Sequence, residues 1–174
     1  LERMRALIRE GMEAGAFGLS TGLAYSPGDL VGKRELMEIA KPLREFGGFY
    51  ATHMRNQGEG TFDSLEETRY IGEGAGIPIH VSHLKLADPK MWGKTEAVFR
   101  WFEQVNANGL KATFDVYPYT RGCSGILRLL PPWSKEGGVA DTIRRLTDND
   151  EVYGQYDQVI SPMDSIKPIE KHAG

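Results

Sequence analysis

Several features that define protein classes are scarce in this chain of 174 residues. A single cysteine, Cys123, excludes an internal disulfide and a four-cysteine zinc cluster, and it favours a reducing, cytoplasmic location. No run approaches the roughly 18–20 consecutive apolar residues that crossing a bilayer requires. The net charge of −3 provides no basic surface for nucleic acid. We therefore expect neither a membrane nor a nucleic acid among the partners.

The chain does contain a regular alternation of two patterns. Apolar residues at helical spacing predict helices over Arg3–Ala14, Lys33–Phe46, Thr61–Gly74, Lys94–Asn108 and Val139–Leu146. Short apolar runs between them predict strands at Ala16–Thr21, Gly48–His53, Ile77–His83 and Leu110–Val116. Such alternation is typical of βαβ units on a parallel sheet. Because an eight-stranded barrel takes ~250 residues, we expect an α/β fold, a partial (β/α)8 TIM barrel of about four βα units.

Two histidines, His53 and His83, end successive predicted strands. The carboxyl ends of parallel strands share one edge, and neutral imidazole is a good zinc ligand, so we predict that this pair binds Zn²⁺. The alternative for each is a loop histidine bonded to a backbone carbonyl. A catalytic zinc takes three protein ligands and a water, so two histidines do not complete a site. His80 should point away from His83 in a regular strand, and we interpret it as structural.

A bound zinc lowers the pKa of water towards ~7, which makes hydroxide available to attack a carbonyl carbon. The pattern therefore indicates amide or ester hydrolysis. Such a reaction also needs a proton-transfer group, usually a carboxylate. Asp115 has a suitable position at the end of a predicted strand, although a role in the turn before Tyr117 and Pro118 is equally compatible with the sequence.

Other polar residues follow the predicted strands. Arg55 and Lys85 lie two residues after the two histidines, where a cation could bind a substrate carboxylate or simply be a solvated charge. Tyr117 could donate its hydroxyl to an oxyanion or pack as an aromatic with a solvated tip. We interpret Cys123 as a small loop residue rather than as a nucleophile or a ligand.

Five stretches of the chain, in this order and spacing, match one known family. They are Gly18–Tyr25 with Pro27 and Gly28, Tyr50–Asn56 with Gly58, Val81–Lys85, Asp115–Tyr119 and Leu129–Trp133. Through them the chain resembles the D-aminoacylase, or N-acyl-D-amino-acid deacylase, group of the amidohydrolase superfamily. The resemblance implies a zinc-bearing (β/α)8 barrel with a small β domain. It also implies hydrolysis of the amide bond of small N-acyl-D-amino acids by zinc-bound hydroxide.

The resemblance also implies roles for individual residues. His53 and His83 correspond to the zinc ligands from the fifth and sixth strands, and Lys85 and Tyr117 to substrate-contacting positions. Cys123 falls where the family usually has a small hydroxyl residue that lines the pocket, and Arg55 matches the arginine of the family's THMR stretch. We therefore predict Arg55, Lys85, Tyr117 and Cys123 as substrate-binding residues.

The family's remaining site residues have no match in this chain. Its first-strand HxH pair and metal-binding cysteine precede the matched region, and its catalytic aspartate follows it. We therefore predict no catalytic residue here and expect a central fragment, which alone would bind metal weakly and hydrolyse amides poorly. The resemblance assigns residues 1–138 to a partial barrel and residues 139–174 to a loosely structured, lid-like insertion.

Two alternatives remain open at this point. The chain could be a catalytically inactive half-barrel that associates with itself or with a partner chain, because unpaired strand edges invite pairing. It could also belong to a cyclic-amide hydrolase of the dihydropyrimidinase type. The THMR and DVYPY stretches favour the deacylase over the cyclic-amide hydrolase.

Overall fold

The structure is a computed structural model, and it describes residues 1–119, 134 and 137–147. The chain divides into two compact units, Leu1–Thr120 and Arg121–Gly174. The boundary predicted from the sequence, after residue 138, stays a prediction because most of residues 120–138 lie outside the described ranges. None of the described helices is both long and apolar enough to cross a membrane.

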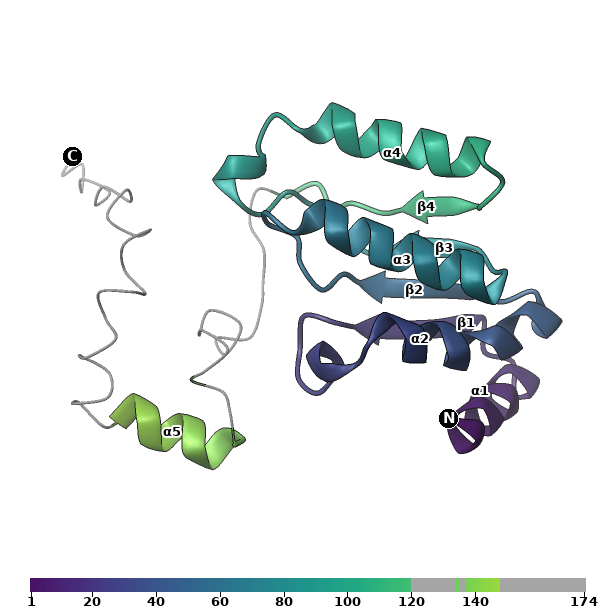
Figure 1. Ribbon diagram of the computed structural model, residues 1–174, viewed down its shortest axis with the longest axis horizontal. Coiled ribbons are helices and arrows are strands. Elements are labelled where there is room, and N and C mark those ends of the chain that lie inside the picture. Colours follow the sequence, from purple (N-terminus) through teal and green to yellow (C-terminus); the bar gives the residue numbers. More distant parts are fainter. Residues whose placement is uncertain (120–133, 135–136, 148–174) are drawn as a thin grey trace. The chain divides into compact units, whose positions relative to one another are not determined.

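The first unit alternates helices and strands as predicted (Figure 1). Its helices are α1 (Glu2–Glu13), α2 (Lys33–Ala40), α3 (Thr61–Ala75) and α4 (Thr95–Ala107). Its strands are β1 (Gly18–Gly22), β2 (Phe49–His53), β3 (Ile79–Val81) and β4 (Ala112–Phe114). Three short 3₁₀ helices occupy Gly28–Leu30, Lys41–Phe46 and Pro89–Met91. In the second unit, α5 spans Val139–Thr147, close to the helix predicted there.

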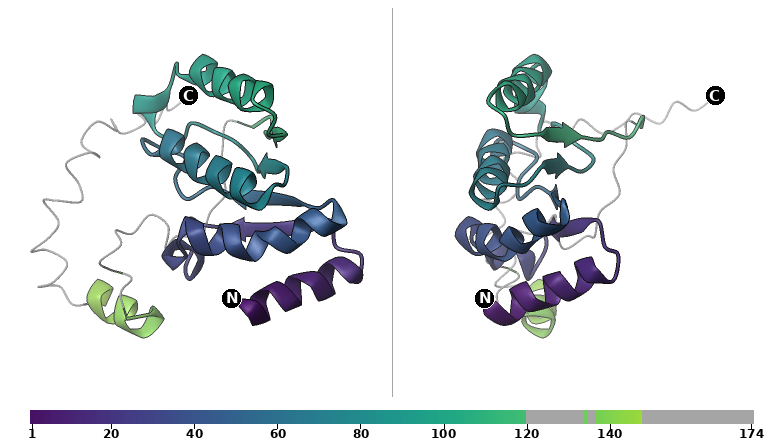
Figure 2. Two further views of the ribbon diagram at one scale, coloured as in Figure 1. Left: turned by 45° about the vertical axis from the view of Figure 1, so that its right-hand side comes forward. Right: turned by 90° about the vertical axis from the view of Figure 1, so that its right-hand side faces the viewer.

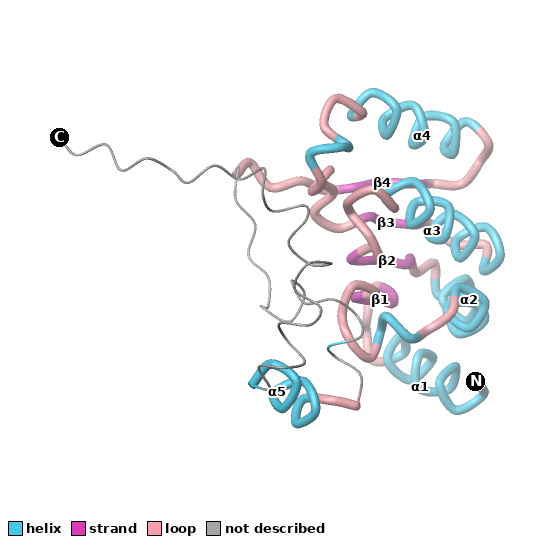
Figure 3. The backbone as a smooth tube through the Cα atoms, turned by 60° about the vertical axis from the view of Figure 1, so that its left-hand side comes forward, coloured by secondary structure: helices cyan, strands magenta, loops and turns pink. Residues whose placement is uncertain are grey.

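The four strands form one parallel sheet in the order β1-β2-β3-β4, so neighbours in sequence are neighbours in space. Helices α2, α3 and α4 cover one face of this sheet (Figure 2). The loops that follow the strands leave from the same edge of the sheet (Figure 3). The prediction of an α/β fold made of four βα units, part of a barrel, is confirmed.

The core lies between the sheet and the helices that cover it. Tyr50, Ile79 and Val81 project from the strands and are at most 1% exposed. They meet apolar residues of the helices, which are Leu36, Ile39, Leu65, Ile71, Val98 and Phe102. Burying each such side chain contributes roughly 1.5–3 kcal/mol. On the other face, alternate strand residues are polar or small, as at Ala51, His80 and Thr113, which lie side by side in the register.

Three predicted elements differ in extent, and one of them, the strand expected over Leu110–Val116, is confined to Ala112–Phe114. The helix expected over Lys33–Phe46 ends as an α-helix at Ala40 and continues as a 3₁₀ helix, because Pro42 lies at its start and cannot donate a backbone hydrogen bond. The strand expected over Ile77–His83 is confined to Ile79–Val81. Because β3 ends at Val81, His83 lies in the turn after the strand, as described below.

Candidate metal centre

His53 and His83 meet at the carboxyl edge of the sheet. His53 is the last residue of β2, and His83 follows the end of β3 by two residues. The Nδ1 atom of His53 lies 2.9 Å from the Nε2 atom of His83. The two rings are nearly perpendicular, with centroids 4.5 Å apart and an interplanar angle of 71°. Two ring nitrogens from neighbouring strands therefore converge on one point.

This geometry fits two ligand positions of a zinc ion. With zinc–nitrogen bonds of ~2.0–2.1 Å, two nitrogens of a tetrahedral site lie about 3.3 Å apart. The observed 2.9 Å is close enough for small ring rotations to open the gap. Within the described residues no group of three or more histidine, cysteine or carboxylate side chains could hold a metal. A third ligand would have to come from outside those residues.

The backbone around His83 is held in an unusual conformation. His83 has a φ of 41°, the one positive φ at a residue other than glycine among the described residues. Its N–H donates to Oδ1 of Asp115 at 2.6 Å, and the N–H of Leu84 donates to the carbonyl of Asp115 at 2.8 Å. A left-handed backbone costs a residue with a Cβ about 1–2 kcal/mol. These two bonds to Asp115 stabilise the turn that presents the His83 ring towards His53.

Asp115 also binds His80, at the polar face of the sheet. Nε2 of His80 lies 2.7 Å from Oδ2 of Asp115, and Nδ1 lies 2.9 Å from the hydroxyl of Thr113. The hydrogen bond from His80 lowers the pKa of the Asp115 carboxyl, and the backbone bond from His83 acts in the same direction. The premise of a regular strand through His83 was wrong, because β3 ends at Val81. His80 and His83 therefore share Asp115 as a partner.

Lys85 and Tyr117, both predicted to bind substrate, lie together beside His83. The Lys85 ammonium donates to the His83 carbonyl at 2.9 Å and lies 5.3 Å from the centre of the Tyr117 ring. Tyr117 stacks in turn on Tyr119, with centroids 6.3 Å apart. A cation and a phenol are thus brought next to the histidine pair. Cys123, also predicted to bind substrate, lies outside the described residues.

Gln57 is a contact of this group that sequence reasoning missed. Its side chain is 1% exposed, its Oε1 accepts from Lys85 at 2.8 Å, and its Nε2 lies 3.3 Å from Nδ1 of His83. Its backbone carbonyl accepts from the N–H of Ala87 at 2.7 Å, which ties the loop after β2 to the loop after β3. A glutamine in a glycine-bearing loop carries no signal that would single it out.

Arg55 has partners within the fold. Its guanidinium donates to both carboxylate oxygens of Glu67 at 3.0 Å. It also donates to the carbonyls of Asp29 and Val31, both at 2.7 Å. Arg55 thereby fastens the loop between β1 and α2 to α3. A role in substrate binding stays a prediction.

The loop that Arg55 holds carries Tyr25, a second contact that the sequence did not indicate. The Tyr25 ring lies against the His53 ring with centroids 4.7 Å apart, and its hydroxyl is 3.5 Å from Nδ1 of His53. A phenol packed at a tilt of 58° against the imidazole restricts the orientations of that ring. Arg55 and Tyr25 therefore both act on how His53 is placed.

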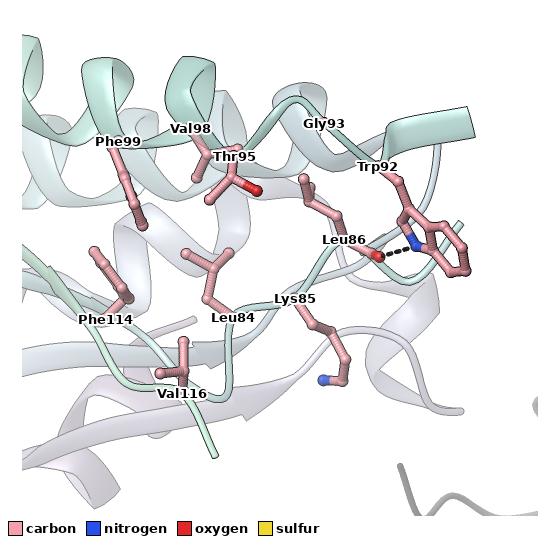
Figure 4. A pocket seen from close by; sticks show the side chains of 10 residues that line it. All are labelled: Leu84, Lys85, Leu86, Trp92, Gly93, Thr95, Val98, Phe99, Phe114 and Val116. Atoms are coloured by element: carbon pink, nitrogen blue, oxygen red, sulfur yellow. Dashed lines mark hydrogen bonds between the residues drawn. The ribbon is translucent and has the colours of Figure 1, made fainter. Parts of the chain in front are cut away.

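An apolar cavity of about 360 Å³ lies between β4, α4 and the loop after β3 (Figure 4). Leu84, Phe99 and Phe114 point towards one another there, whereas the Lys85 side chain extends away from them. Neither His53 nor His83 lines this cavity. The cavity and the histidine pair are distinct features of the first unit.

Comparisons with known proteins point to one group of enzymes. The chain is 38% identical to a D-aminoacylase of Alcaligenes xylosoxydans xylosoxydans over 119 residues, 68% of this chain and 24% of that protein. It is 35% identical to an N-acyl-D-glutamate deacylase of the same organism over 124 residues, 71% of this chain and 25% of the relative. No protein-family profile matches.

Solved structures agree with the sequence comparison. A crystal structure of a D-aminoacylase, described as defining a subset of amidohydrolases, superposes with a TM-score of 0.67 at 36% identity, over 70% of this chain and 25% of that one. The N-acyl-D-glutamate deacylase of Bordetella bronchiseptica, solved with zinc and a phosphonate inhibitor, gives a TM-score of 0.65 at 35% identity, over 68% and 25%. The chain thus spans about a quarter of the length of the relatives it matches.

Proposed function

The matched part of the chain belongs to the D-aminoacylase and N-acyl-D-amino-acid deacylase family of amidohydrolases, and on this premise we propose that the protein hydrolyses the amide bond of an N-acyl-D-amino acid with the help of zinc. The observation that carries the proposal is the 2.9 Å approach of Nδ1 of His53 to Nε2 of His83. It lies at the edge of the sheet where parallel α/β barrels place their active sites.

His53 and His83 would hold the metal, which when bound supplies a Lewis acid that polarises a carbonyl and lowers the pKa of water. Asp115 and Tyr25 keep the two rings in place through the contacts described above. The Lys85 ammonium beside Tyr117 offers a positive charge for the carboxylate of an N-acyl amino acid. Under this proposal the chain's own residues would supply two metal ligands and a positive charge for the substrate's carboxylate.

Zinc titration of the 174-residue chain tests the metal site. We expect one zinc ion to bind, and we expect His53→Gln and His83→Gln each to weaken binding by at least about 10-fold, since each removes a ligand. Gln104→Leu is the control, because Gln104 is exposed on α4 and its side chain is not a histidine, cysteine or carboxylate ligand. Equal zinc affinity in all four proteins would refute the site.

Enantiomer selectivity tests the substrate class. We expect N-acetyl-D-glutamate, added to the zinc-loaded chain, to shift the NMR signals of the Lys85 side chain and the Tyr117 ring. We expect the L enantiomer at the same concentration to shift them several-fold less. The variant Lys85→Met should lose the response, because it keeps a long apolar side chain without the charge. Equal responses to the two enantiomers would contradict a preference for D-amino acids.

Self-association is a second candidate property, favoured by the sheet. Within the described residues β1 and β4 each pair with one neighbour, so each has a free edge, and an unpaired strand edge is a template for another chain. Light scattering as a function of concentration measures this property. A monomer at all concentrations would argue against it.

A further inference from the structure

The second nitrogen of His83 faces two hydrogen-bond donors. The groups near Nδ1 are the amide nitrogen of Gln57 at 3.3 Å and the ammonium of Lys85 at 3.2 Å. An ammonium and an amide NH₂ can only donate, so Nδ1 must accept. A neutral imidazole carries one hydrogen, which then resides on Nε2 and points at Nδ1 of His53, 2.9 Å away.

A metal ion on Nε2 of His83 reverses this arrangement. The metal takes the lone pair of Nε2, so the ring hydrogen must move to Nδ1, which then needs an acceptor. Among the described residues, the group placed to provide one is Gln57, whose Oε1 accepts from Lys85 at 2.8 Å. A half-turn of the amide brings Oε1 to Nδ1 of His83. The same half-turn brings the NH₂ group to the Lys85 ammonium, where two donors oppose each other.

We propose that Gln57 is a positioning residue that couples metal binding at His83 to the placement of the Lys85 ammonium. Without metal, Gln57 holds Lys85 through Oε1; with metal, Gln57 accepts the Nδ1 hydrogen of His83 and releases Lys85. The released ammonium becomes available to a substrate carboxylate. By linkage, a carboxylate bound to Lys85 strengthens metal binding by the same factor. This inference rests on the metal site proposed above.

The burial of Gln57 supports its role. At 1% exposure the amide has little water to replace a lost partner, so each rearrangement must be met by the groups around it. The loop position of Gln57 is fixed by the bond from Ala87 to its carbonyl, which leaves rotation of the amide as the available change. The Lys85 ammonium keeps the His83 carbonyl at 2.9 Å as an acceptor in either state.

The experiment is NMR of the ¹⁵N-labelled chain with and without zinc, because long-range proton–nitrogen correlations show which ring nitrogen carries the hydrogen. We expect His83 to carry it on Nε2 without zinc and on Nδ1 with zinc, together with a shift of the Lys85 Nζ signal. A hydrogen on Nδ1 in both states, or an unmoved Lys85 signal with zinc bound, would overturn the proposal.

Two variants of Gln57 test whether its side chain links zinc binding to the Lys85 ammonium. Gln57→Leu cannot accept a hydrogen bond, so its zinc affinity should fall roughly 10- to 100-fold, as for other partners of metal-binding histidines. Gln57→Glu offers one oxygen to His83 and one to Lys85, so it should bind zinc at least as tightly as the original chain while its Lys85 signal stays unmoved. The Glu variant also serves if the Leu variant fails to fold.

Gln104→Leu is the matched control, because Gln104 is exposed on α4, and its zinc affinity should equal that of the original chain. Zinc binding that is unchanged in Gln57→Leu would overturn the role of Gln57 and leave the histidine pair standing. A complete absence of zinc binding by the original chain would instead refute the metal site, and the coupling with it.

Discussion

Replacing Arg55 by methionine should destabilise the first unit by about 2–4 kcal/mol. Arg55 makes four hydrogen bonds, two to the Glu67 carboxylate and two to loop carbonyls. Hydrogen bonds to charged groups contribute roughly 1.5–3 kcal/mol each. The Arg55 side chain is 31% exposed, so water replaces part of what is lost and the simple sum is reduced. The Glu67 side chain, 13% exposed, is left with an uncompensated charge, which keeps the cost substantial.

Urea unfolding of the chain, followed by circular dichroism, measures this cost. Arg69→Met is the matched control, because Arg69 lies on α3, the helix that carries Glu67, and pairs with the more exposed carboxylates of Glu66 and Glu73. Exposed ion pairs contribute ~0–1 kcal/mol, so the control should change little. If the two arginine variants cost the same, burial does not strengthen the Arg55 pair and the reasoning is refuted.

A double mutant isolates the pair itself. Glu67→Leu added to Arg55→Met removes the stranded charge, so the double variant should be more stable than the sum of the single effects predicts, by about 1–2 kcal/mol. Additive effects would show that Arg55 acts through the loop carbonyls alone. In that case Arg55→Met would mainly loosen the loop between β1 and α2, and with it the contact between Tyr25 and His53.

Three further predictions concern stability. Burial raises the pKa of the Tyr50 hydroxyl, so the contribution of Tyr50 to the free energy of unfolding is complete below the ordinary phenol pKa of about 10 and is lost as the pH rises towards the raised pKa. Tyr50→Phe should therefore lose less stability between pH 10 and 11 than the original chain does. The hydrogen bond from His80 lowers the pKa of Asp115, so the contribution of Asp115 to stability is present above about pH 4 and is lost as the pH falls through the lowered pKa. The stability of Asp115→Asn should therefore fall less steeply with decreasing pH than that of the original chain, and an equal fall would contradict this. Gly72→Ala places a methyl group 2.4 Å from the Ile79 side chain and should lower the free energy of unfolding by roughly 1–3 kcal/mol. Gly11→Ala has open space around the added methyl group and should raise it by about 0.5–1 kcal/mol in the same urea assay.

The order of helices and strands was predictable because the spacing of apolar residues and the positions of glycine and proline indicate the same elements along the chain. Helix α3 begins at Thr61 as predicted and ends at Ala75, one residue later than predicted, where Gly76 takes a positive φ of 69°. The lengths of β3 and β4 were not predictable, since each was overestimated by four residues. Apolar residues flank both strands, and hydropathy does not reveal where pairing with a neighbouring strand stops.

The histidine pair was predictable because it depends only on strand order and on the shared edge of a parallel sheet. The contacts around it were not. Gln57 and Tyr25 reach the two rings from loops, and their side-chain directions depend on loop conformations that have no period in the sequence. Asp115 was found by position, but its link to both His80 and the His83 backbone follows from a turn that the pattern did not indicate.

That turn makes position 83 subject to two separate selective demands. The imidazole is required for the proposed ligand, while the φ of 41° favours glycine or asparagine, which adopt the left-handed region most readily. A relative that had lost its metal would be released from the first demand and would still be under the second. Glycine or asparagine at this position in a natural sequence would therefore identify a member of the family that has kept the fold and given up the metal.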